Sequence, residues 1–257
     1  MRIHALIAAA FVLATPLGAA AKDAALAKAV APEHRSENFV ARDKYRHPQE
    51  VLEFFGIKPT MTVVEISPGG GYWTEILGPY LKEKGTYYTA VGQRGYDMWT
   101  KKVAEKKDVY GEVKVTTLGP GGEIAPAGSA DLVLTFRNIH NYMAAGFADD
   151  VFAEFYKTLK PGGILGIEEH RAATDQPQDP KAANGYVRED YTIQLAEKAG
   201  FKLLGKSEVL ANPKDTKNWP AGVWTLPPTL KLGEQDRDKY LAIGEADNFL
   251  LKFQKPK

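Results

Sequence analysis

The sequence contains no cysteine among its 257 residues. Without thiols the chain forms no disulfide, carries no cysteine-linked lipid anchor and holds no cysteine-ligated iron–sulfur cluster. A covalent thiolate mechanism is excluded for the same reason. These absences remove several classes of exported and redox proteins and leave most group-transfer chemistry open.

The chain also lacks an excess of charge of either sign. Lysine and arginine together number 33 against 32 acidic residues, which gives a formal net charge of +1. A protein that binds nucleic acid needs a basic surface, so we expect no nucleic-acid partner. The length and the 44% share of hydrophobic residues fit one globular domain with a sizeable core.

Only one long apolar run is present, at residues 5–17. It follows Arg2, and the small residues 18–21 come after it. This order is typical of a secretory signal peptide, for which we expect cleavage after Ala21, or alternatively after Ala20. An uncleaved anchor is the other alternative. We therefore expect a periplasmic or secreted protein with no stable membrane insertion once the signal peptide at 1–21 is removed.

The most informative motif is a mostly apolar segment that runs through one acid into a glycine-rich turn. Residues 61–66 contain Glu65, Ser-Pro-Gly-Gly-Gly follows at 67–71, and a helical pattern begins at Trp73. Glycine has no Cβ and adopts positive φ, so the backbone can pass close to a ligand, and the free N–H groups of the next helix favour negative charge. The motif indicates a nucleotide-cofactor site. A tight turn without a ligand is the alternative.

Strand-like and helix-like segments alternate along most of the chain. Pro48 suits the start of a helix that Gly56 ends, with apolar residues on one face. The alternation indicates a doubly wound, mostly parallel sheet. Strands are expected at 62–66, 87–91, 112–118, 131–136, 164–167, 201–210 and 249–253.

Two segments lie outside this alternation. Residues 22–47 are predicted to form an N-terminal arm ahead of the domain at 48–257. Residues 211–248 contain four prolines and no sustained periodicity. Because this stretch also carries Trp219 and Trp224, we expect an ordered insertion or cap before the last strand rather than disorder.

Three features together resemble one family: the acid and glycine turn at 65–71, Lys-Pro-Gly-Gly at 160–163 ahead of a strand, and a terminal strand pair with an insertion. The chain is similar to the class I S-adenosylmethionine-dependent methyltransferases over residues 48–253. The resemblance implies an α/β, Rossmann-like fold with a seven-stranded sheet whose last strand is antiparallel. It also implies S-adenosylmethionine as the cofactor.

A narrower resemblance is carried by three polar segments. They resemble a bacterial group of predicted, exported methyltransferases whose substrate is unknown. The segments are 42–46, 136–141 and 212–215.

The resemblance also implies which residues contact the cofactor. Glu65 would pair with its amino-acid portion. Ser67 departs from the first glycine of the family's turn, and Gln93 follows the second strand where an acid for the ribose hydroxyls is common. A nicotinamide dehydrogenase fits less well because it needs that acid. The expected cofactor-binding residues are Glu65, Ser67, Gly69, Gly70, Gly71, Tyr72, Gln93 and Asn138.

Candidate catalytic residues follow the apolar strand at 131–136, at the sheet edge where open α/β folds bind ligands. Methyl transfer is an in-line displacement that needs alignment and exclusion of water, with a general base as an option. His140 suits that base near neutral pH, and Arg137 suits an anionic acceptor. Loop caps and a surface histidine are the alternative for this segment.

Further side chains are candidates for contact with the acceptor. His170 belongs to the charged run 168–171, which is equally typical of a solvated loop. We expect no metal, because neither a helical two-histidine spacing nor a cysteine ligand is present. The acceptor-contact candidates are Tyr45, Arg46, Arg137, Asn141 and His170.

The sequence thus predicts methyl transfer from S-adenosylmethionine to a small-molecule acceptor. The alternative is an exported binding or accessory protein that keeps the methyltransferase fold without transfer activity, because fold does not determine function.

Overall fold

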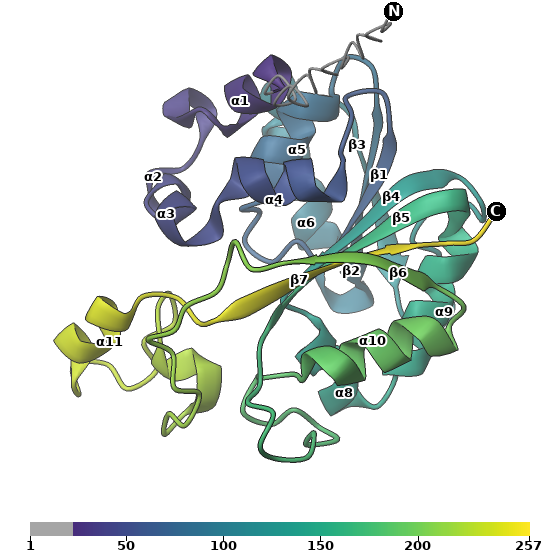
Figure 1. The fold of residues 1–257 in the computed structure, drawn as a ribbon. Helices are drawn as coiled ribbons and strands as arrows, with labels where there is room; N and C mark the ends of the chain where they lie inside the picture. Colours follow the sequence, from purple (N-terminus) through teal and green to yellow (C-terminus); the bar gives the residue numbers. More distant parts are fainter. Residues whose placement is uncertain (1–22) are drawn as a thin grey trace, which may run out of the picture.

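A single sheet forms the centre of the computed structural model, which describes residues 23–257; the expected signal peptide lies outside them. Within that range seven strands pair in the order β3-β2-β1-β4-β5-β7-β6 (Figure 1). The strands are β1 Thr62–Ile66, β2 Thr86–Gly92, β3 Val113–Leu118, β4 Ala130–Phe136, β5 Leu159–His170, β6 Lys202–Ser207 and β7 Asn248–Gln254.

Strands β1 to β5 run parallel, and β7 is antiparallel to both of its neighbours, β5 and β6. Helices cover both faces of this sheet (Figure 1). The predicted fold class, a Rossmann-like seven-stranded sheet with an antiparallel last strand, is therefore confirmed.

Three strand limits differ from the sequence expectation by more than one residue. β5 ends at His170 rather than at residue 167, so Glu168 and Glu169 are buried strand residues and not part of a solvated loop. β5 begins at Leu159 rather than Ile164, because the backbone of Gly162 and Gly163 pairs with Lys255 at 2.8 and 2.9 Å beyond the end of β7. β6 ends at Ser207, since residues 208–211 form a hydrogen-bonded turn in place of the expected continuation.

The helices divide between the two faces. One core joins the sheet to α8, α9 and α10, and the other joins it to α1, α4 and α5, which lie on opposite sides in Figure 1. Helix α6 packs separately on β2 and β3. The helices are α1 Ala24–Val30, α2 Glu37–Val40, α3 Asp43–Arg46, α4 Pro48–Phe55, α5 Thr74–Leu81, α6 Tyr96–Glu105, α7 Lys107–Tyr110, α8 Ile139–Ala145, α9 Ala148–Thr158, α10 Glu189–Lys198 and α11 Arg237–Ile243.

Local sequence explains how α4 is placed against the sheet. Pro48 occupies its first turn, and Gly56 ends it with φ of 80°, so the predicted helix is confirmed. Its buried Phe55 packs so close to β5 that a Cβ on Gly166 would lie 2.7 Å from the Phe55 ring and from Leu134. The close approach of helix and sheet requires glycine at position 166.

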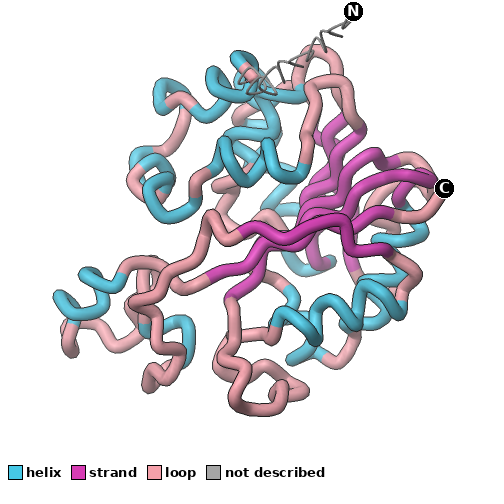
Figure 2. Tube along the Cα trace, in the orientation of Figure 1, coloured by secondary structure: helices cyan, strands magenta, loops and turns pink. Residues whose placement is uncertain are grey.

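The segments 23–47 and 211–248 both reach the carboxyl edge of the parallel strands. The first contains α1 to α3, and the second contains a short 3₁₀ helix, Gly222–Thr225, and α11. Much of the second is irregular backbone beyond the sheet (Figure 2). Together with Tyr186 from the segment before α10, it forms a small separate core in which Leu226 and Tyr240 are also buried. We call residues 211–247 the cap.

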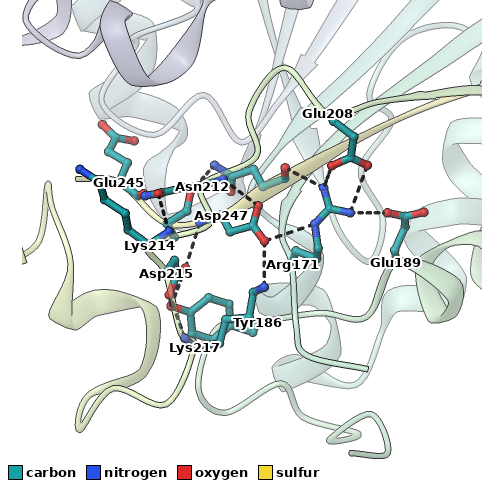
Figure 3. A network of polar contacts seen from close by, with 12 residues as sticks. Arg171, Tyr186, Glu189, Glu208, Asn212, Lys214, Asp215, Lys217, Glu245 and Asp247 are labelled. Atoms are coloured by element: carbon teal, nitrogen blue, oxygen red, sulfur yellow. Dashed lines mark hydrogen bonds and ion pairs between the residues drawn. The ribbon is translucent and has the colours of Figure 1, made fainter. Parts of the chain in front are cut away.

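A buried carboxylate of the cap anchors it to the segment that precedes α10 (Figure 3). Asp215 accepts hydrogen bonds from the Tyr186 hydroxyl at 3.0 and 3.1 Å, from Trp219 Nε1 at 2.7 Å and from the backbone N–H of Asp247 at 2.9 Å. Arg171, just after β5, forms ion pairs with Asp247 at 3.3 Å and with two further carboxylates. The irregular cap is therefore held by charge-assisted hydrogen bonds as well as by apolar packing.

Among the described residues, no helix combines the length and the apolar character that a membrane span requires.

We expect Asp215→Ala to lower the free energy of unfolding by about 3 kcal/mol, because it leaves the Tyr186 hydroxyl and the Asp247 N–H buried without an acceptor. Urea denaturation measures this change. Asp175→Ala, at an exposed acid, is the matched control and should stay within about 0.5 kcal/mol of the parent protein. Equal stabilities for the two variants would contradict the assigned role.

Candidate functional site

A cavity of about 330 Å³ lies at the carboxyl edge of the parallel strands. Its volume is at the lower end of the roughly 300–1,000 Å³ that small-molecule sites occupy. Its wall combines side chains of the arm, the sheet edge and the cap. The lining residues are Phe39, Arg42, Arg46, Glu65, Ser67, Pro68, Gly69, Gly70, Tyr72, Trp73, Phe136, Arg137, Asn138, His140, His170, Val223, Trp224, Pro227, Pro228 and Thr229.

Glu65 near the end of β1 is a buried carboxyl group with incomplete partners. Its Oε2 accepts hydrogen bonds from the Tyr87 hydroxyl and from Thr74 Oγ1, the latter at 2.7 Å. Its Oε1 is buried and has no hydrogen-bond partner among residues 23–257. Burial raises the pKa of Glu65 to about 7. A cationic group in the cavity would supply the missing partner.

The glycine turn leaves open space beside Glu65. Gly69 has φ of 60°, and a Cβ built there would meet no atom within 4 Å. A Cβ built at Gly70 would lie 3.3 Å from the ring of Phe39 of the arm. Ser67 adopts φ of 49°, a strained conformation for a residue with a side chain. Gly71 packs against Trp99, which would lie 3.2 Å from a Cβ built there, and it does not line the cavity.

Tyr72 forms part of the wall nearest the arm. Its hydroxyl donates to Asp43 Oδ1 at 2.6 Å, and the guanidinium of Arg46 lies 4.4 Å from its ring centroid. These contacts hold the arm against the start of α5.

Asn138 supports the strand ends. Its Nδ2 donates to the carbonyl oxygens of Ile66 at 3.2 Å and Phe136 at 3.1 Å. This amide therefore joins the ends of β1 and β4 at the floor of the cavity.

His140, at the start of α8, and Glu169, near the end of β5, form a buried pair. Glu169 Oε1 accepts from His140 Nδ1 at 3.0 Å and from the N–H of His170 at 2.8 Å. Glu169 Oε2 accepts from the N–H groups of Ile139 and His140, at 2.6 and 3.3 Å. With Nδ1 engaged, Nε2 is the ring nitrogen of His140 left for a ligand.

The two members of this pair have shifted pKa values. Although burial alone acts in the opposite direction, the Glu169 carboxylate raises the pKa of His140 above its usual value. Burial likewise opposes the effect of His140 on Glu169, whose pKa nevertheless stays below its usual value. The pair is thus a carboxylate that orients an imidazole and favours its charged form.

His170 lies beside this pair, with its ring centroid 5.6 Å from that of His140. Burial lowers the pKa of His170 to about 3, so this imidazole is neutral at physiological pH. His140, Glu169 and His170 offer ligand atoms within 4.8 Å of one another. Because both oxygens of Glu169 already accept two N–H groups each, we assign no metal to this cluster.

Glu245 of the cap is a site residue that the sequence did not reveal. It is 3% exposed and accepts from Arg42 Nε at 2.5 Å and from Arg137 Nη1 at 2.7 Å, while Arg46 Nε lies 3.5 Å away. Although burial acts in the opposite direction, Arg137 and Arg42 hold the pKa of Glu245 below its usual value. Its position in a segment without periodicity gave no signal.

Arg137 also lies near a second carboxyl group. Its Nε is 3.5 Å from Glu168 Oε1, an ion-pair distance without a hydrogen bond, and neither carboxyl oxygen of Glu168 has a hydrogen-bond partner among residues 23–257. Burial raises the pKa of Glu168 to about 7. The backbone N–H of Arg137, at φ of 60°, donates to the Glu168 carbonyl at 2.6 Å.

The structure places three further candidates outside the cavity. Gln93 is exposed on a 3₁₀ turn after β2, and Asn141 is exposed on α8. Tyr45 packs against Gly244 of the cap, where a Cβ would lie 2.7 Å from its ring. The remaining candidates converge on the cavity, apart from Gly71 as described above.

Comparisons with known proteins were made by sequence and by structure. No family model matches the chain. Over 210 residues it is 25% identical to the sterol 24-C-methyltransferase ERG6B of Gibberella zeae, a match that covers 75% of this chain and 52% of that protein. The chain thus spans about half the length of this curated relative.

Solved structures share the fold. A structure described as a SAM-dependent methyltransferase from Aquifex aeolicus has a TM-score of 0.58 at 18% identity and covers 90% of this chain and 96% of its own. The [4+2]-cyclase SpnF has a TM-score of 0.58 at 16% identity, over 87% and 84% of the two chains. The chain therefore has the Rossmann-like methyltransferase fold, which a protein described as a cyclase shares.

We expect Glu169→Gln to lower the pKa of the His140 imidazole, because an amide cannot stabilise the charged ring as a carboxylate does. NMR titration of histidine ring signals measures it. Glu50→Gln, which alters an exposed carboxylate, should leave the His140 titration unchanged. An unchanged His140 pKa in folded Glu169→Gln protein would contradict the pairing.

Proposed function

We propose that this protein binds S-adenosylmethionine and transfers its methyl group to a small-molecule acceptor. The observation that carries the proposal is the buried Oε1 of Glu65, which has no hydrogen-bond partner among residues 23–257 and lies near the carboxyl end of β1, beside the open Gly69. The methyltransferase fold and the sterol methyltransferase relative support it.

The residues present fit the amino-acid end of the cofactor best. Its ammonium group would complete the hydrogen-bonding of Glu65, and the open backbone at Gly69 would admit it. Gln93, in the place of an acid for the ribose, is exposed and outside the cavity. The part of the site that would hold the amino-acid end of the cofactor is therefore better defined than the part that would hold its ribose.

When bound, S-adenosylmethionine would supply an electrophilic methyl group, which the acceptor would attack in line so that the carbon–sulfur bond breaks and S-adenosylhomocysteine leaves. The chain's part is to bind, orient and exclude water. Trp224 of the cap and Phe39 of the arm both line the cavity and restrict the access of water. His140, held at Nδ1 by Glu169, would accept a proton from the acceptor at Nε2.

Export belongs to the same proposal. A leader at 1–21 would deliver the protein to the periplasm or the outside, as in the exported bacterial group that the sequence resembles. A compartment without an evident cofactor supply favours the alternative, a binding or accessory protein without transfer activity. Ser67 and the lack of a ribose acid at position 93 favour it as well.

Calorimetry on the purified protein separates the two functions. Micromolar binding of S-adenosylmethionine supports the enzyme, and no binding up to millimolar concentration rules it out. Mass spectrometry of small molecules retained by the protein would then identify the acceptor or the bound ligand.

We expect Glu65→Gln to weaken binding of S-adenosylhomocysteine by about tenfold or more, because a charge-assisted hydrogen bond becomes a neutral one. Burial raises the pKa of Glu65 to about 7, so its ionised fraction, and with it the affinity, should rise several-fold between pH 6 and 7.5. Calorimetry at both pH values should show this rise in the parent protein and in the exposed control Glu83→Gln. A rise of the same size in Glu65→Gln would refute the assignment.

We expect His140→Ala to lower turnover on the identified acceptor with little change in cofactor affinity, because the imidazole acts on the acceptor rather than on the cofactor. Steady-state kinetics and calorimetry provide the two measurements. Full activity in this variant would show that His140 is not the base.

A further inference from the structure

The charges around the cavity are arranged in two layers. Three guanidinium groups, those of Arg42, Arg46 and Arg137, form part of the cavity wall. The carboxyl groups that face them, Glu245 and Glu168, are buried and do not line the cavity. Basic groups therefore face the ligand space, and the acids that compensate them lie behind.

The two buried glutamates do not engage all of the N–H donors of the three guanidinium groups. Each guanidinium carries five N–H groups, whereas Glu245 engages Arg42 through two nitrogens, Arg137 through one and Arg46 through Nε alone. Among residues 23–257, neither terminal nitrogen of Arg46 donates to a protein acceptor, and Tyr72 holds this guanidinium in place from one side. The wall thus has spare, oriented donors.

The cluster also has an excess of positive charge. Three guanidiniums carry three positive charges and Glu245 carries one negative charge. Glu168 and the cavity-lining Glu65 each add at most one more, and burial raises the pKa of both to about 7, so positive charge is in excess whenever either of them is protonated. A small anion in the cavity would balance this excess through charge-assisted hydrogen bonds from the guanidinium groups.

We propose that the cavity binds the carboxylate or phosphate group of an anionic small molecule through Arg42, Arg46 and Arg137. Only the identification of this molecule as the methyl acceptor rests on the proposed function. Arginine suits both groups because its planar fork matches two oxygens at once. Arg137 follows β4, three residues before His140, so an acceptor anchored there would have its reactive atom near the candidate base.

The cofactor has a carboxylate of its own, which one of these arginines can bind. Three guanidiniums exceed what a single carboxylate needs, which favours a second anion beside the cofactor. The two sources are distinguished by measuring anion binding with and without saturating S-adenosylhomocysteine.

The test is a titration of the full chain with inorganic phosphate and, separately, with succinate, at constant ionic strength set by chloride. Binding is read by calorimetry and by the fluorescence of the tryptophans, of which Trp73 and Trp224 line the cavity. Binding of either probe with S-adenosylhomocysteine present is expected, and the tighter probe identifies the preferred group.

Arg46→Gln is the informative variant, because Arg46 has the weakest contact with Glu245 and its loss disturbs the fold least. It should weaken binding of the preferred probe about tenfold or more. Arg94→Gln, at an exposed arginine after β2, should leave it unchanged. Thermal unfolding checks that each variant is folded, and Arg137→Gln repeats the test at a second guanidinium that contacts Glu245.

Three outcomes overturn the proposal: neither probe binds, Arg46→Gln and Arg137→Gln bind the probes as the parent protein does, or saturating S-adenosylhomocysteine abolishes anion binding. The last would assign the arginines to the cofactor's carboxylate. If S-adenosylhomocysteine fails to bind while the probes bind in an arginine-dependent manner, the methyltransferase proposal fails and the anion site stands.

Discussion

The site depends on how four buried carboxyl groups at one edge of the sheet are stabilised. Glu65, Glu168, Glu169 and Glu245 are each at most 3% exposed. A buried carboxylate costs several kcal/mol unless it is paired, hydrogen-bonded or protonated. Glu169 is surrounded by N–H donors, Glu245 is paired with arginines, and burial raises the pKa of Glu65 and Glu168. The three ways of stabilising a buried carboxyl group therefore give different parts of the site different chemistry.

The pairing of Glu245 also joins the arm to the cap at the cavity wall. Arg42 and Arg46 belong to the arm and Glu245 to the cap, so these ion pairs join segments about 200 residues apart in the chain. The same guanidiniums line the cavity. An anion that competes with Glu245 for these guanidiniums would therefore weaken the contact between arm and cap. Anion binding and the arm–cap contact thus depend on the same groups.

The parallel part of the fold could be predicted from the sequence because strand and helix patterns alternate, whereas the antiparallel last strand was implied by the family resemblance. The cluster at Arg137 and His140 follows from one rule, that parallel strands place their carboxyl ends together. Glu245 could not be predicted, because its partners are distant in the chain and its segment has no periodicity. Gln93 and Asn141 show the reverse error: each follows a strand or begins a helix at the correct edge, but neither lines the cavity.

Glu65 and Glu169 are the same residue type, but their hydrogen-bond partners give them different roles: Glu65 is available to bind a ligand, and Glu169 orients His140. Both are buried glutamates near the ends of parallel strands, yet their pKa values shift in opposite directions. Glu169 has four N–H donors and is complete without a ligand, so its effect is exerted through His140. Glu65 has an oxygen without a partner among the described residues. Since buried polar groups are normally satisfied, a group left incomplete at a cavity wall indicates where a ligand completes the structure.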